Sequence, residues 1–94
     1  MSIRFQWDPD KATRNDSKYG IPFLEAATVF HDPLAFIFDD EEHSVEEYRE
    51  IIIGHSKRER LLVVAFTERD DVIRIISARK ANQRERKGYE TTRR

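Results

Sequence analysis

The sequence contains no cysteine, and this absence limits the kinds of site that the chain can build. Without thiols there is neither a disulfide framework nor a thiolate zinc site. The three histidines, His31, His43 and His55, lack the spacing of metal ligands. The sequence therefore indicates no cofactor.

Long apolar runs are also missing. No stretch approaches the roughly 18 residues that a membrane-spanning helix needs, and the first residues lack the apolar run of a signal peptide. We therefore expect a cytoplasmic protein without membrane contact. The 94 residues, 38% hydrophobic and 37% charged, predict a single domain over 1–94 with a modest core and a strongly charged surface.

Positive charge is scarce in the first half of the chain. Residues 1–47 hold 4 basic and 11 acidic residues, a net charge of −7, whereas residues 48–94 hold 13 basic and 7 acidic residues, a net charge of +6. A basic face attracts polyanions even on a protein whose net charge is −1, because the local potential steers ligands. The alternative is an ordinary solvated run of charge.

Local patterns predict the elements of an α+β fold. Asp8 as N-cap, Pro9 and the C-terminal Gly20 predict a helix over 9–19, and an apolar stripe beginning at Phe23 predicts a second helix that Pro33 ends. Strand-like runs and a last helix complete the order, over 3–7, 34–38, 48–54, 60–66, 72–79 and 83–90. The short connections favour a mainly antiparallel sheet, packed with two N-terminal helices and a short C-terminal helix.

The last two strands can be paired from the sequence. If Asp70 and Asp71 form a two-residue turn, one-for-one pairing places Arg60, Ser77 and Arg79 on one face of the sheet. Arg60 is then a diagonal neighbour of Arg79, roughly 7–8 Å away. Such a pair of like charges suits a bound anion. The alternative is that Arg79 forms an ordinary salt bridge with Glu85 or Glu90.

Four blocks of the chain resemble the toxins of BrnT/BrnA toxin–antitoxin systems, namely "FQWDPDKATRNDSKYGIPFLEAATVFHDP", "DDEEHSVEEYREIIIG", "RLLVVAFTER" and "IRIISARKANQRERKGYE". The resemblance implies a RelE-like α+β fold and a ribonuclease that halts translation. It also implies neutralisation by the antitoxin BrnA, whose ribbon-helix-helix segment binds operator DNA.

The chain departs from the family pattern at three points. Tyr19 stands where the family has histidine, Pro22 replaces a serine cap, and the usual glycine of the hairpin turn is absent at Asp70 and Asp71.

Metal-free RNA cleavage needs phosphate stabilisation, an oriented 2′-hydroxyl and a proton route to the leaving oxygen. Arginine grips phosphate oxygens bidentately, so we expect Arg79 and Arg60 to form a phosphate clamp, with Ser77 as a further donor. Tyr89 is a candidate for base stacking or proton transfer. The expected RNA-binding residues are Lys57, Arg58 and Arg86.

Structural roles compete with each assignment. Tyr89 can simply anchor the last helix, and Glu85 is expected to form a capping box with Asn82 rather than act as a base. His43 and His55 are weaker catalytic candidates, because a capping box begun by Ser44 explains the first and a loop position explains the second.

Two other functional classes remain open. One is a non-catalytic RNA- or ribosome-binding module. The other is an interaction domain whose acidic half or exposed edge strand binds a partner.

Overall fold

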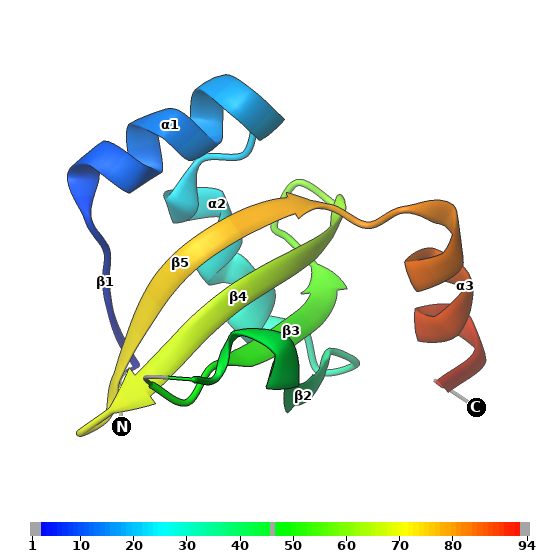
Figure 1. The fold of residues 1–94 in the computed structure, drawn as a ribbon. Helices are drawn as coiled ribbons and strands as arrows, with labels where there is room; N and C mark the ends of the chain where they lie inside the picture. Colours follow the sequence, from blue (N-terminus) through cyan, green and yellow to red (C-terminus); the bar gives the residue numbers. More distant parts are fainter. Residues whose placement is uncertain (1–2, 46, 93–94) are drawn as a thin grey trace.

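The structure of the protein is a computed structural model that describes residues 3–45 and 47–92. Within these residues, a five-stranded sheet carries two N-terminal helices on one face, and a C-terminal helix lies beside the other (Figure 1). The predicted α+β class is therefore confirmed. The strands are β1 Arg4–Gln6, β2 Phe36–Asp39, β3 Glu50–His55, β4 Leu61–Arg69 and β5 Val72–Lys80.

The strand order in the sheet is β1-β5-β4-β3-β2. The strands from β2 to β5 pair in antiparallel fashion, as their short connections predicted. β1 pairs parallel to β5, with Arg4 opposite Val72 and Gln6 opposite Arg74. No turn joins these two strands, so the chain connection does not impose an antiparallel direction on them.

The helices begin and end close to the predicted residues. They are α1 Pro9–Tyr19, α2 Phe23–Thr28 and α3 Gln83–Thr92, with 3-10 turns η1 Val29–His31 and η2 Glu41–His43. Asp8 accepts the hydrogen bond of the Asp10 N–H at 2.8 Å, and Gly20 ends α1 with a φ of 70°. None of these described helices is long and apolar enough to cross a membrane.

The second helix is shorter than predicted, because its last turn tightens into η1. The Thr28 hydroxyl donates to the Glu25 carbonyl at 2.6 Å, and Pro33 disfavours helical geometry at Asp32, which is extended. This early ending leaves Asp32 free to turn its carboxylate toward the end of β3.

The core between the helices and the sheet is built by apolar side chains of both layers. Its fully or almost fully buried members are Ile21, Phe23, Ala26, Val29, Ile52, Leu62, Val64, Phe66, Ile73, Ile75 and Ala78. Two edge-to-face aromatic contacts extend this core, one between Trp7 and Phe23 and one between Phe30 and Phe66.

The β4–β5 turn is confirmed, but the predicted pairing holds over only half of the hairpin. Asp70 and Asp71 have φ values of 52° and 65°, as a type I′ turn requires. Pairing proceeds one for one from Arg69 and Val72 as far as Phe66. A β-bulge then shifts the register by one residue.

Beyond the bulge, Ala65 lies opposite Ser77 and Val63 lies opposite Arg79. The predicted pairing of Leu62 with Arg79 is therefore wrong, since Leu62 lies opposite Lys80. A one-residue shift exchanges the faces of all later side chains. It places Ala78 in the core against the helices, where a serine or an arginine would be costly.

Asn15 ties α1 to β5 where β1 no longer pairs with it. Its buried amide donates to the carbonyls of Ala78 and Ile21 at 2.8 and 3.0 Å, and its oxygen accepts the N–H of Ala78 at 3.1 Å. The side chain therefore satisfies both backbone groups of a strand residue.

The second face of the sheet holds a smaller core under α3. Ile53, Leu61 and Val63 pack with Tyr89, which is 1% exposed and stacks on Phe36 at 6.0 Å between ring centroids. Tyr89 is thus the anchor of α3, as the competing structural role predicted.

The start of α3 is the predicted capping box. The Asn82 side chain accepts the Glu85 N–H at 2.8 Å, and Glu85 accepts the Asn82 N–H at 2.9 Å. The capping box predicted at Ser44 does not form, because its hydroxyl instead donates to the Asp40 carbonyl and accepts the Arg49 N–H, at 2.7 and 2.9 Å. These two bonds close a loop rather than begin a helix.

Gly54 in β3 leaves no room for a side chain. A Cβ there would lie 2.7 Å from that of Ala35 and 3.0 Å from a carboxylate oxygen of Asp32. We expect Gly54→Ala to lower the free energy of unfolding by about 1–3 kcal/mol through overpacking, measured by urea denaturation. Gly88→Ala in α3 is the control, because its Cβ meets no atom within 4 Å and a helical alanine stabilises. Equal stability of both variants would contradict the close approach at Gly54.

Candidate functional site at the β3–β4 turn

Arg60 ends the turn between β3 and β4 and is held on the helix side of the sheet. Its Nε donates to a carboxylate oxygen of Glu25 at 2.8 Å, and its Nη2 donates to the other oxygen of the same group. The Ser56 hydroxyl donates to Glu25 at 2.7 Å. Since the side chain of Glu25 is only 5% exposed, Arg60 serves as the partner of a buried charge.

The charge states of this pair support each other. The hydrogen bond from Arg60 holds the pKa of Glu25 below its ordinary value, outweighing burial, which alone would raise it. The same hydrogen bond raises the pKa of Arg60. Glu25 therefore contributes stability above its ordinary pKa, and this contribution is lost as the pH falls through the lowered value.

Arg79 lies on the other face of the sheet and contacts α3. Its two terminal nitrogens donate to the two carboxylate oxygens of Glu85 at 2.7 and 2.8 Å. The hydrogen bonding between the two side chains lowers the pKa of Glu85 and raises the pKa of Arg79. The predicted alternative of a salt bridge with Glu85 is confirmed.

The predicted side-by-side placement of Arg60 and Arg79 is wrong. The bulge at Ile76 turns Arg79 to the face opposite Arg60, and each guanidinium is bound to a carboxylate of its own. Ser77, two residues before Arg79, points to the same face, and both residues line a groove on the face away from the two N-terminal helices. The two arginines cannot hold one phosphate together in this arrangement.

Asp32 is the meeting point of three segments at this end of the sheet. One of its oxygens accepts the His55 N–H at 2.7 Å and the Tyr89 hydroxyl at 3.0 Å, and the other accepts the Leu34 N–H at 2.9 Å. Burial alone would raise the pKa of Asp32, but these hydrogen bonds outweigh it and hold the pKa below its ordinary value. Asp32 is thus an ionised carboxylate that is hydrogen-bonded to the last residue of β3.

The hydroxyl of Tyr89 lies between Asp32 and His55. Because the Tyr89 hydroxyl gives its hydrogen to Asp32, its oxygen can accept a hydrogen from His55 Nδ1, which lies 3.3 Å away. A neutral imidazole that donates from Nδ1 in this contact keeps its lone pair on Nε2. A histidine in this state can accept a proton from a substrate.

His55 opens into a pocket that also contains a second histidine and a cation. The pocket is lined by Thr28, His31, Asp32, His55, Ser56 and Lys57. His31 and Lys57 are exposed at its surface, while the Lys57 N–H is held by the Thr28 hydroxyl at 2.8 Å. We call this set the His55 pocket. It brings together two imidazoles, which are able to transfer protons, and one ammonium group, which is able to bind phosphate.

The predicted RNA-binding residues are all exposed. Lys57 and Arg58 lie in the β3–β4 turn, and Arg86 lies on α3 three residues before Tyr89. Since Tyr89 contacts His55, the turn and the helix flank the same end of the sheet. These three positive charges from the second half of the chain therefore lie at the end of the sheet that holds the His55 pocket.

Two features of this pocket were not predicted from the sequence. The first is that His31 and His55 line the same pocket. They lie on η1 and β3, and their spacing in the sequence does not predict that they come together. Asp32 was interpreted only as the residue before a proline, because its hydrogen bonds with β3 and α3 depend on tertiary contacts. Among the described residues there is no group of three or more His, Cys, Asp or Glu side chains that could hold a metal ion.

The fold has a known counterpart. It is similar to the 1.1 Å crystal structure of the Brucella abortus ribonuclease toxin, BrnT, with a TM-score of 0.66 and 22% sequence identity, over 87% of this chain and 100% of that chain. At this identity the similarity concerns the fold alone. The protein is thus of the class of small α+β proteins with a five-stranded, mostly antiparallel sheet.

The family follows from the sequence itself. Residues 7–85 match the family described as ribonuclease toxin, BrnT, of type II toxin–antitoxin systems. Because this match covers most of the chain, the protein belongs to that family, and the resemblance stated from four sequence blocks is confirmed. A search of curated proteins found no match.

We expect Glu25→Gln to lower the melting temperature at pH 7, because glutamine cannot supply the charge that Arg60 and Ser56 bind. The difference from the wild type should shrink as the pH falls below the ordinary carboxyl value of 4.5, where Glu25 itself becomes protonated. Thermal melting between pH 3 and 7 measures this. Glu41→Gln, in the exposed η2 turn, is the control. A difference in melting temperature that stayed constant with pH would show that the shape of the Glu25 side chain, and not its charge, stabilises the fold.

Proposed function

We propose that this chain is an endoribonuclease that inhibits translation and that its catalytic groups lie in the His55 pocket. The observation that carries the proposal is a chain of two hydrogen bonds that links Asp32 to the Tyr89 hydroxyl and this hydroxyl to His55. His31 and Lys57 line the same pocket. Family membership supplies the reaction class, and the pocket supplies groups that suit it. In this proposal Tyr89 acts as a positioning residue.

The first step is removal of a proton from the RNA. His55 Nε2 accepts the proton of a ribose 2′-hydroxyl, and the oxygen attacks the adjacent phosphorus. Asp32, acting through the Tyr89 hydroxyl, keeps the imidazole oriented and stabilises the positive charge that it acquires. A partly buried, ionised carboxylate suits this task because its negative charge is already present before the reaction.

The second step is release of the leaving oxygen. The bond between phosphorus and the 5′-oxygen breaks, and His31, in its protonated form, gives that oxygen a proton. The products are a 2′,3′-cyclic phosphate and a 5′-hydroxyl end. Lys57 balances the additional negative charge on the phosphate oxygens in the transition state.

We further propose that cleavage is independent of metal ions. The nucleophile is the substrate's own hydroxyl, so no ion is needed to generate it. The pocket supplies a base, an acid and a cation from the protein. Lys57, Arg58 and Arg86 would track the RNA backbone on either side of the cleaved bond.

The family description implies an antitoxin partner. We propose that it is a BrnA-like protein with a ribbon-helix-helix segment and that the chain reaches operator DNA only through it. Because the substrate is cellular RNA, we place the activity in the cytoplasm.

We expect His55→Ala to lower the rate of RNA cleavage about 10²–10⁴-fold, because the base is lost. The assay is cleavage of a labelled RNA by the purified chain in the presence of a chelator. His43→Ala is the matched control, since His43 is an exposed histidine bound to Asp40 in another loop. We expect it to cleave at the wild-type rate.

Three outcomes of this assay would count against parts of the proposal. Wild-type activity in His55→Ala would remove His55 from the mechanism. Activity that disappears with the chelator would show a metal requirement. RNA binding without any cleavage would favour the non-catalytic module.

The predicted role of Arg79 can be separated from its contact with α3. If Arg79 binds phosphate, Arg79→Ala should lower cleavage at least tenfold, whereas Glu85→Ala, which frees the guanidinium, should keep or raise it. If Arg79 only fastens α3, both variants should lose activity and stability together. Cleavage rates and melting temperatures of the two variants distinguish these roles.

A further inference from the structure

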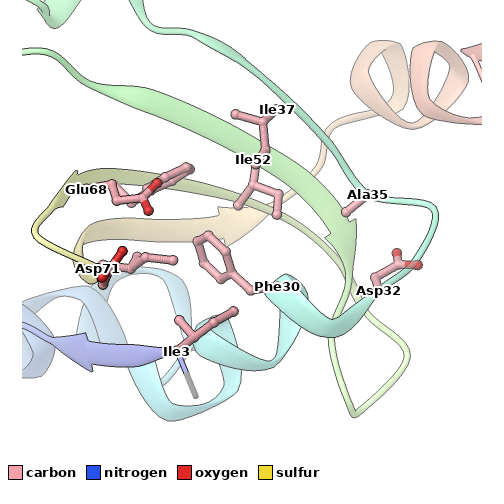
Figure 2. Close-up of a pocket in the computed structure, with 10 residues that line it drawn as sticks. Ile3, Phe30, Asp32, Ala35, Ile37, Ile52, Glu68 and Asp71 are labelled. Carbon is pink, nitrogen blue, oxygen red and sulfur yellow. The ribbon is translucent and has the colours of Figure 1, made fainter. Parts of the chain in front are cut away.

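An apolar groove lies on the helix side of the sheet, beside the edge strand β2 (Figure 2). Ile37 and Ile52 line one side of it, and Phe30 and Ile3 line the other. Ile37 is 51% exposed and Ile3 is 45% exposed, although both lie next to buried core residues. Exposed apolar side chains that surround a concave surface are typical of an interaction site.

One end of this groove is acidic. Glu68 and Asp71 lie there, at the β4–β5 turn, and both are exposed (Figure 2). Glu50 lies close by, and its partial burial and the charges of Glu68 and Asp39 raise its pKa. No lysine or arginine is found among the described residues that line the groove. RNA is therefore repelled, whereas a cationic group would relieve the repulsion between the carboxylates.

The other end of the groove reaches the His55 pocket. Asp32 lines both cavities, and Figure 2 places it at the end of the groove opposite Glu68 and Asp71. A chain segment lying along the groove would thus end at the rim of the proposed catalytic pocket. An occupant bound here can cover that pocket without competing for the basic surface of α3.

We propose that this groove binds the antitoxin, through a segment whose apolar side chains fill the space between Ile37 and Phe30 and whose lysine or arginine side chains meet Glu68 and Asp71. The inference rests on the proposed function, because it assigns a surface to the partner of the toxin. Bound in this way, the antitoxin excludes RNA from His55 by covering the pocket at Asp32.

A second copy of the chain fits the groove less well. The basic helix α3 of a second copy carries one large apolar side chain among its described residues, that of Tyr89, and this side chain is buried. The exposed face of α3 therefore offers charge but nothing to fill the apolar space. The groove and α3 also lie on different faces of the sheet, so a contact between them would join two different surfaces of the chain.

The test uses the full chain and a purified BrnA-like antitoxin, with affinity measured by titration calorimetry. We expect Ile37→Thr and Glu68→Lys each to weaken binding at least tenfold. Threonine keeps the β-branched shape that suits a strand, and a lysine at 68 removes a charge that repels Glu50, so both variants should fold. The matched controls are Val45→Thr and Glu41→Lys, which change exposed residues outside the groove.

RNA cleavage by the same variants separates this inference from the proposed function. We expect both groove variants to cleave RNA at the wild-type rate and to resist inhibition by the partner. Unchanged affinity in both variants, or a wild-type chain that does not bind this partner at all, would overturn the inference. Altered self-association of the variants in analytical ultracentrifugation, with partner affinity unchanged, would assign the groove to a second copy instead. A wild-type chain that binds the partner but cleaves no RNA would overturn the proposed function and leave the docking surface in place.

Discussion

The hydrogen bonds of one partly buried carboxylate hold together the end of the sheet at which β3 ends. Asp32 accepts from the backbone of β3, from the backbone that leads into β2 and from the hydroxyl that anchors α3. Three segments far apart in the sequence are thereby held around His55. The same residue lines both the apolar groove and the His55 pocket, so the proposed docking surface and the proposed catalytic pocket meet at a single side chain.

The β-bulge in the central hairpin also shapes the arrangement of charge. It decides that Arg79 lies on the face of the sheet opposite Arg60. It sends Arg79 to Glu85 on α3, while Arg60 binds Glu25 on α2. Both guanidiniums thus hold helices to the sheet. The exposed side chains of Lys57, Arg58 and Arg86 lie at the end of the sheet near His55, whereas Arg69 and Arg74 are exposed near the hairpin turn. The acidic groups Glu50, Glu68 and Asp71 gather toward the hairpin end.

Sequence reasoning succeeded where the cause was local. The ends of α1 followed from Asp8 and Gly20, and the α3 capping box followed from the spacing of Asn82 and Glu85. It failed where one extra residue in a strand changed the side on which all later residues point. Nothing near Ile76 marks a bulge, since the insertion is explained by the fit of Ala78 under the helices rather than by any turn residue.

The amino-acid sequence by itself determined the α+β class, the family, the ends of α1 and the start of α3, because caps, turns and apolar periodicity act within a few residues of each other. It also determined the separation of charge between the two halves of the chain. Only the tertiary structure decided that Arg60 and Arg79 lie apart and that His31, His55 and Asp32 share one pocket. Those relations depend on strand register and on helix packing, and both are settled by contacts between residues remote in the sequence.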